Sequence, residues 1–144
     1  ASKYPRSEQK QLFIARVGDD GKLRHNKTYK RDSNFTTRTR TLGTYTIAKD
    51  TVAPTIKPKN FRTKEWLSNY RYLSLSISDD LSGIKTYDAY LNGKWILMEY
   101  EPKTNTITYN FDDNIDDQTQ CKLKVVVTDN VGNSTTFEDT FFRK

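Results

Sequence analysis

The sequence predicts an all-β protein in which an immunoglobulin-like β-sandwich follows a small segment rich in β-hairpins. Strand-forming Thr, Tyr, Phe, Val and Ile recur throughout the 144 residues, and short alternating segments are separated by turn residues. Only 34% of the residues are hydrophobic, but 12% are aromatic, and large rings bury much apolar area per residue. No stretch has convincing helical periodicity; residues 63–70 hold one helical turn at most.

The sandwich is expected over residues 51–144. Its first strand carries Pro54, which lacks a backbone N–H and therefore suits a sheet edge. Residues 72–78 alternate between apolar side chains and serines, as a half-buried strand does. Asn92-Gly93 predicts a two-residue hairpin. Further strands are expected over residues 84–91, 95–98, 106–111, 123–127 and 135–142, and about seven short strands are typical of an immunoglobulin-like sandwich.

Residues 1–50 are expected to form a separate, basic β-strand segment. The first ten residues suggest a tail or linker, and strands are expected over residues 11–17, 22–25, 35–40 and 43–48. These strands supply few core residues, and so short a segment buries little surface on its own. We expect it either to pack against the sandwich or to be half of an upstream β-domain.

The net charge of +6 lies entirely in this first segment. Residues 1–50 carry twelve Lys and Arg against five Asp and Glu, whereas residues 51–144 carry twelve against thirteen. Such asymmetry marks a boundary between units or a face that meets something anionic. Arg38 and Arg40, two positions apart in an expected strand, are the candidate ligand-binding residues of that face. An anionic envelope polymer and an acidic surface of an upstream domain fit them equally well; a nucleic acid is not favoured, because the sequence has no known reading motif.

Four segments, in order, carry a resemblance to a known family. They are Leu42-Gly43-Thr44-Tyr45 with Asp50-Thr51-Val52-Ala53-Pro54-Thr55-Ile56, then Ile77-Ser78-Asp79-Asp80-Leu81-Ser82-Gly83-Ile84, then Leu91-Asn92-Gly93-Lys94-Trp95-Ile96-Leu97-Met98-Glu99-Tyr100, and finally Val127-Thr128-Asp129-Asn130-Val131-Gly132-Asn133. The stretch from Gly43 to Lys144 thereby resembles the C-terminal immunoglobulin-like region of lysostaphin-type zinc metallopeptidases from Gram-negative cell envelopes. The resemblance implies a peptidoglycan-cutting parent protein outside the cytoplasm, periplasmic or surface-exposed.

The resemblance does not bring catalysis with it. The family's zinc site needs several His and an Asp in a separate upstream domain, whereas this chain has one histidine, His25. His25 is expected to be an exposed loop residue, and Cys121 a small core residue without a catalytic role. No catalytic residue and no cofactor is therefore expected, and no apolar stretch approaches the ~20 residues of a membrane span.

Two groups of acidic residues are candidate calcium ligands. Asp79, Asp80, Asp129 and Asn130 lie in two turns that meet if both are at one end of the sandwich. The alternative, which we favour, is that these side chains cap their own turns, because the spacing of a dedicated calcium loop is missing. The second group is an acidic loop with Asp112, Asp113, Asp116 and Asp117, for which a solvated loop is the favoured interpretation.

Aromatic side chains could form a sugar-stacking surface. Trp66 lies in an expected loop and is the best exposed candidate, whereas Trp95 is expected in the core beside Leu97.

Three functional hypotheses follow. The first is a non-catalytic accessory module that spaces or docks an upstream peptidase domain or another envelope protein. The second is a stand-alone adhesin or glycan-binding module. The third is salt-sensitive binding of an anionic polymer by residues 1–50.

Overall fold

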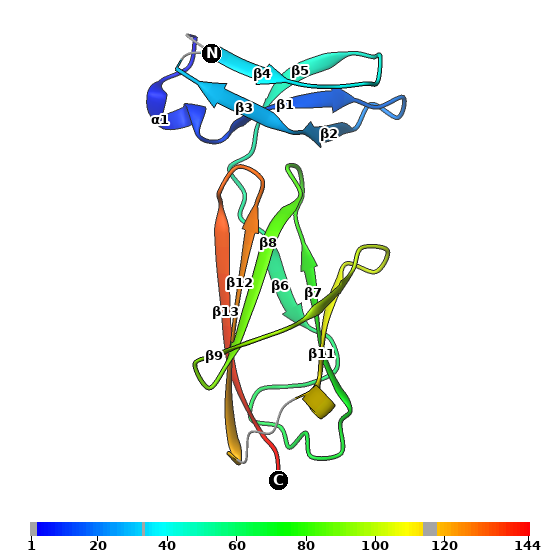
Figure 1. Cartoon of the computed structure of the whole chain (residues 1–144), viewed down its shortest axis with the longest axis vertical. Coiled ribbons are helices and arrows are strands. Elements are labelled where there is room, and N and C mark those ends of the chain that lie inside the picture. The colour runs from blue at the N-terminus through cyan, green and yellow to red at the C-terminus, as the bar shows by residue number, and fades with distance from the viewer. Residues whose placement is uncertain (1–2, 33, 114–117) are drawn as a thin grey trace.

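The computed structural model describes residues 3–32, 34–113 and 118–144. Within these residues the strands form two lobes stacked end to end (Figure 1). The N-terminal lobe contains a three-stranded sheet and a separate hairpin, and the C-terminal lobe is a sandwich of two four-stranded sheets. The all-β, immunoglobulin-like fold class is therefore confirmed. No helix in the described part of the chain is long and apolar enough to cross a membrane.

The N-terminal lobe begins with a short helix, α1 (Arg6–Gln9), inside the stretch expected to be a tail. Pro5, with φ fixed near the helical value, precedes it, and the Lys49 ammonium holds Glu8 at 2.7 Å. The central strand β1 (Leu12–Val17) pairs antiparallel with β2 (Leu23–Asn26) and β5 (Tyr45–Lys49). Strands β3 (Thr28–Arg31) and β4 (Asn34–Thr37) form an antiparallel hairpin, and β3 lies between the strands expected over residues 22–25 and 35–40.

One sheet of the sandwich has the order β10-β11-β7-β6. Its strands are β6 (Thr55–Pro58), β7 (Tyr72–Ser78), β10 (Glu99–Glu101) and β11 (Thr106–Asn110). Strand β6 lies at the edge of the sheet as predicted, but it begins at Thr55, so Pro54 precedes the strand and is not part of it. In β7 the apolar positions of the alternation, Leu73, Leu75 and Ile77, are fully buried.

The other sheet has the order β13-β12-β8-β9. Its strands are β8 (Ile84–Leu91), β9 (Lys94–Ile96), β12 (Gln120–Asp129) and β13 (Ser134–Phe142). Asn92 and Gly93 both have positive φ, 49° and 81°, so the predicted tight hairpin joins β8 to β9. The expected continuous strand 95–98 is wrong, because β9 ends at Ile96 and the chain crosses to the other sheet as β10.

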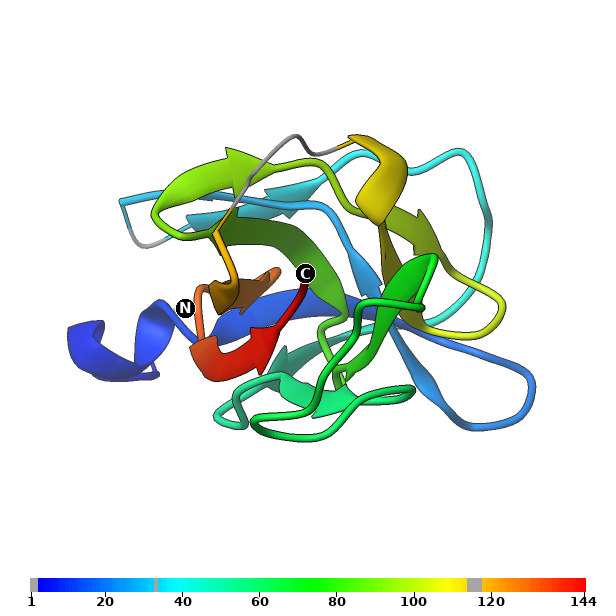
Figure 2. The same ribbon diagram turned by 90° about the horizontal axis from the view of Figure 1, so that it is seen from below.

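The two sheets enclose the main core, which includes Leu75, Ile107, Val125 and Phe141. The turn after β7 and the turn between β12 and β13 both lie at the end of the sandwich that faces the N-terminal lobe (Figure 1). The C-terminus lies at the other end, nearest the viewer in Figure 2, where the chain is seen from below. This arrangement places the two turns and the connection at residues 50–54 at one junction.

Candidate functional site

Three aspartates from separate parts of the chain meet at the junction of the lobes. Asp50 follows β5, Asp79 follows β7, and Asp129 is the last residue of β12. One carboxylate oxygen of each lies within 4.8 Å of the other two. In the described part of the chain this is the only group of three or more His, Cys, Asp or Glu side chains close enough to hold one metal ion.

Asp129 organises the turn between β12 and β13. Its Oδ1 accepts hydrogen bonds from the backbone N–H groups of Val131, Gly132 and Asn133 at 2.9, 2.7 and 2.8 Å. The side-chain amide of Asn133 donates to Oδ2 at 2.7 Å. The residue is fully buried, so its charge is held in a network of donors from its own turn.

Asp79 organises the turn that follows β7 in the same way, but only through one of its oxygens. Its Oδ2 accepts from the N–H groups of Gly83 at 2.7 Å and Leu81 at 3.2 Å. Gly83 has φ 82°, a left-handed conformation that other residues rarely adopt. Oδ1 of Asp79 is buried and has no hydrogen-bond partner among the described residues. Asn130 ties the two turns together by donating to the carbonyl oxygens of Ser82 and Gly83.

Asp50 joins the connection between the lobes to both turns. Its Oδ2 accepts from the buried N–H of Ser82 at 2.9 Å, and its Oδ1 accepts from the N–H of Val52 at 3.1 Å. The amide of Asn133 donates to the backbone carbonyl of Asp50 at 3.2 Å. In turn, Gln11 of the N-terminal lobe donates to Oδ1 of Asn133 at 3.4 Å.

Apolar packing completes the junction. Phe13 and Ala15 from β1 and Ala48 from β5 form the small core of the N-terminal lobe. Leu81 and Val131, one from each turn of the sandwich, pack against this core. Residues 1–50 therefore make apolar contacts with the sandwich. Packing against the sandwich is one of the two arrangements expected for a segment with so few core residues.

The carboxylates repel one another in a partly dehydrated setting. Burial raises the pKa of Asp79, and the neighbouring charges of Asp50 and Asp129 raise it further, against the opposing effect of hydrogen bonds from Gly83 and Leu81. The four ion pairs among residues 3–32, 34–113 and 118–144 use the other carboxylates Glu8, Asp20, Asp112 and Glu138. The three junction carboxylates thus lie close together with no ammonium or guanidinium paired to them in that part of the chain.

Only some of the candidate calcium ligands lie close together in the structure. It brings Asp79 and Asp129 together, while both also cap their turns as the alternative interpretation predicted. Asp80 is exposed and outside the group, and Asn130 uses its amide on backbone carbonyls. Asp50 was not among the candidates from the sequence, because only the fold shows that the connection between the lobes passes beside both turns. The one indication in the sequence was that Asp50 is the first residue of the family-like segment 50–56.

The acidic loop is only partly described. Asp112 is exposed, and its carboxylate lies 3.4 Å from the guanidinium group of Arg71. The short helical segment that follows β11 lies toward the end of the sandwich away from the junction (Figure 1). Asp113 closes the short 3-10 helix Phe111–Asp113. Asp116 and Asp117 lie outside the described residues.

Four residues differ from their predicted positions. Trp95 is 58% exposed rather than buried, because Tyr90 and Trp95 are cross-strand partners on the outer face while Ile96 pairs with the buried Ala89. Arg38 and Arg40 are exposed in the loop after β4, which ends at Thr37, so no strand aligns them. His25 lies in β2, partly buried with its ring 5.2 Å from that of Phe13, not in a loop.

The expected burial of Cys121 and the expected exposure of Trp66 are confirmed. Cys121 is 3% exposed and belongs to the main core. Trp66 is 56% exposed in the loop before β7, although one face of its ring packs on Phe142 at 5.2 Å.

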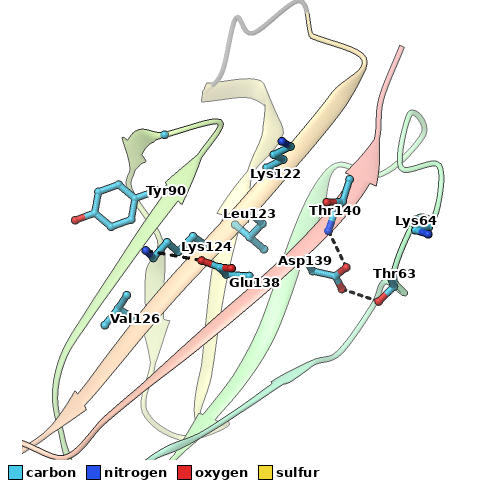
Figure 3. A pocket seen from close by; sticks show the side chains of 11 residues that line it. Thr63, Lys64, Tyr90, Lys122, Leu123, Lys124, Val126, Glu138, Asp139 and Thr140 are labelled. Carbon is cyan, nitrogen blue, oxygen red and sulfur yellow. Dashed lines mark hydrogen bonds and ion pairs between the residues drawn. The ribbon is translucent and has the colours of Figure 1, made fainter.

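A hollow of about 780 Å³ lies on the outer face of the β13-β12-β8-β9 sheet. Figure 3 shows Tyr90, Lys122 and Lys124 along one side of it, and Thr63 and Lys64 along the other. The ammonium of Lys124 lies 3.8 Å from Glu138, and Thr63 donates to Asp139 at 3.1 Å. Trp95, which is exposed, is the cross-strand neighbour of the half-buried Tyr90, so it lies beside a residue that lines this hollow.

Comparisons with known proteins add a distant structural likeness. No family model matches the sequence, and no curated protein matches it. Among solved structures, the fibronectin(III)-like modules of CbhA from Clostridium thermocellum are similar, with a TM-score of 0.49 and 16% identity. The match covers 90% of this chain and 59% of that one.

Proposed function

We propose that this chain is a non-catalytic accessory module of a cell-envelope peptidoglycan peptidase, in which it spaces or docks the catalytic domain. The observation that carries the proposal is where the family-like segments lie. Three of the four, at residues 50–56, 77–84 and 127–133, converge on the junction between the lobes. Their distinctive Asp, Asn and Gly residues are used to fix one lobe on the other.

Such a junction suits a spacer. The lobes are stacked end to end (Figure 1). A partner joined to the far end of one lobe is therefore separated from a partner joined to the far end of the other lobe by the long axis of the folded molecule. Hydrogen bonds from Gln11 through Asn133 to Asp50, and apolar contacts of Leu81 and Val131, restrict bending. A spacer needs this stiffness and needs no reacting groups.

The full gene tests the peptidase part of the proposal. We expect an upstream domain with the His and Asp ligands of a zinc peptidase, and a gene without one would refute this specific form. The accessory role is tested with purified peptidoglycan sacculi. The chain alone should release no soluble fragments, and removing it from the parent enzyme should lower the rate of crosslink cleavage on sacculi more than on a small soluble peptide.

A second candidate function is glycan binding by a surface module. The exposed Trp95, with its half-buried cross-strand neighbour Tyr90 beside the hollow with Lys122 and Lys124, favours it, because aromatic faces stack on sugars and ammonium groups attract anionic glycans. Titration with soluble peptidoglycan fragments should show binding that Trp95→Ala abolishes. Trp66→Ala, which removes the other exposed indole, is the matched control. Equal binding by both variants and the original chain would exclude this surface.

A further inference from the structure

We propose that Asp50, Asp79 and Asp129 bind one Ca²⁺ ion, and that this ion locks the N-terminal lobe onto the sandwich. The proposal does not depend on the peptidase assignment, since it concerns only how the two lobes are held. It differs from the calcium site considered in the sequence, because Asp50 replaces Asp80 and Asn130.

The geometry of the three carboxylates fits one ion. Calcium binds oxygen at 2.3–2.6 Å, so two of its ligands can be at most about 5.2 Å apart. The three oxygens lie within 4.8 Å of one another. They come from the inter-lobe connection, the turn after β7 and the end of β12, so a single ion would contact all three segments of the junction.

A second observation points to a ligand independently of this clustering. Oδ1 of Asp79 is shielded from solvent and accepts no hydrogen bond from the described residues, whereas Oδ2 has the N–H groups of Leu81 and Gly83. A buried carboxylate oxygen without a partner is costly, and native structures rarely contain one without an ion or water to satisfy it. A cation between the three aspartates would supply that partner.

Charge balance favours the same kind of ligand. Asp129 is fully buried and Asp50 is 1% exposed, and neither forms an ion pair among the described residues. Adjacent buried carboxylates disfavour one another's charged forms unless a cation compensates them. A divalent ion would remove most of this repulsion, and the hydrogen bonds from the turns already hold the oxygens in place.

The ligand chemistry selects calcium among divalent ions. The group offers only oxygen, with no His or Cys, which excludes a preference for zinc or copper. Magnesium usually keeps several of its waters, and the burial of Asp50 and Asp129 leaves little room for them. Calcium accepts oxygen ligands in irregular arrangements, which suits three carboxylates contributed by separate segments of the chain.

The experiment uses the whole chain after treatment with EDTA and desalting. Isothermal titration with CaCl₂ should show one site, and saturating Ca²⁺, at roughly 100 times Kd, should raise Tm by roughly 5–10 °C. The same concentration of MgCl₂ should give a much smaller rise. No heat and no change in Tm at 5 mM CaCl₂ would overturn the proposal.

Two variants locate the ion. Asp79→Asn keeps the shape and one acceptor oxygen but removes the charge, and it should weaken Ca²⁺ binding at least tenfold. Asp112→Asn is the matched control at the distant acidic loop, and it should bind like the original chain. Original affinity in Asp79→Asn, or its loss in Asp112→Asn, would place the ion elsewhere.

If Asp79→Asn fails to fold, NMR chemical shifts of the backbone amides of the original chain are measured on addition of Ca²⁺. Changes at Ser82, Gly83 and Gly132 support the site, and changes confined to residues 118–120 overturn it.

Discussion

The Oδ2 atom of Asp50 accepts a hydrogen bond from the backbone N–H of Ser82 at 2.9 Å, and both residues are buried. Asp50 is the first residue after the N-terminal lobe, and Ser82 lies in the turn that follows β7. This single contact therefore joins the connection between the lobes to the end of the sandwich. It also explains why an acidic residue is placed where solvent does not reach.

Asp50→Ala should lower the free energy of unfolding by about 2 kcal/mol in EDTA, because the buried N–H of Ser82 loses its acceptor. Urea denaturation checks this value. Asp80→Ala is the matched control, since Asp80 is an exposed aspartate beside the same turn and should change stability by less than about 0.5 kcal/mol. Equal effects of the two substitutions would mean that the contact does not hold the junction.

Phe13→Ala should destabilise the N-terminal lobe far more than the sandwich. Phe13 is 1% exposed and is the largest side chain of the small core it shares with Ala15 and Ala48. Loss of a buried phenyl ring costs about 3–5 kcal/mol, and this lobe has few other buried contacts to compensate. Amide hydrogen exchange should accelerate in β1 and β5 and stay slow in β12.

Ile47→Ala is the control for that substitution, because Ile47 lies on the other face of β5 and is 41% exposed. It should leave exchange in β1 nearly unchanged. If Phe13→Ala instead accelerates exchange in β12 as strongly as in β1, the two lobes unfold as a single cooperative unit.

Much of the sandwich could be predicted because its signals are local. The alternation of residues 72–78 placed Leu73, Leu75 and Ile77 in the core, and Asn92-Gly93 supplied the positive φ values of a tight turn. The error at Trp95 has a simple cause. Side chains in a strand alternate with period two, so a one-residue error in register exchanges the buried and exposed faces.

The candidate site was predictable only in part. Asp79 and Asp129 could be paired in the sequence because each lies in a recognisable turn, although no sequence rule places the two turns side by side. Asp50 could not be added, since its side chain reaches Ser82 across 32 residues and depends on the stacking of the lobes. The hydrogen bond between Gln11 and Asn133 spans 122 residues and is beyond local reasoning for the same reason.

The stability of the chain should fall as the pH drops below about 6.5, through His25. Burial lowers the pKa of His25, and the nearby Lys30 charge lowers it further, while Asp129 opposes them. The unfolded chain therefore binds the proton more readily than the folded chain. This contribution to stability is fully present above the pKa of His in the unfolded chain. It is lost as the pH falls below that value towards the lowered pKa of His25 in the folded chain.

The measurement compares the free energy of unfolding of the original chain and His25→Phe at pH 7.5 and 5.5. The aromatic contact with Phe13 is kept in the variant, and the carboxylates common to both chains cancel in the difference. The original chain should lose more stability over this range than His25→Phe. An equal loss in both would show that His25 titrates as it does in the unfolded chain.

Cys121 should be unreactive in the folded chain. Its thiol is 3% exposed in the main core, and its Sγ lies 3.5 Å from the carbonyl oxygen of Gln118, to which it donates. A disulfide reagent must reach the sulfur atom to react with it, and burial of Cys121 in the core blocks that access. An aromatic disulfide reagent at pH 8 should therefore label the chain at least 100-fold more slowly in buffer than in denaturing urea. Labelling requires the sandwich to open. If Phe13→Ala weakens only the N-terminal lobe, its labelling rate should equal that of the original chain. If the two lobes unfold together, the labelling rate of Phe13→Ala should be higher.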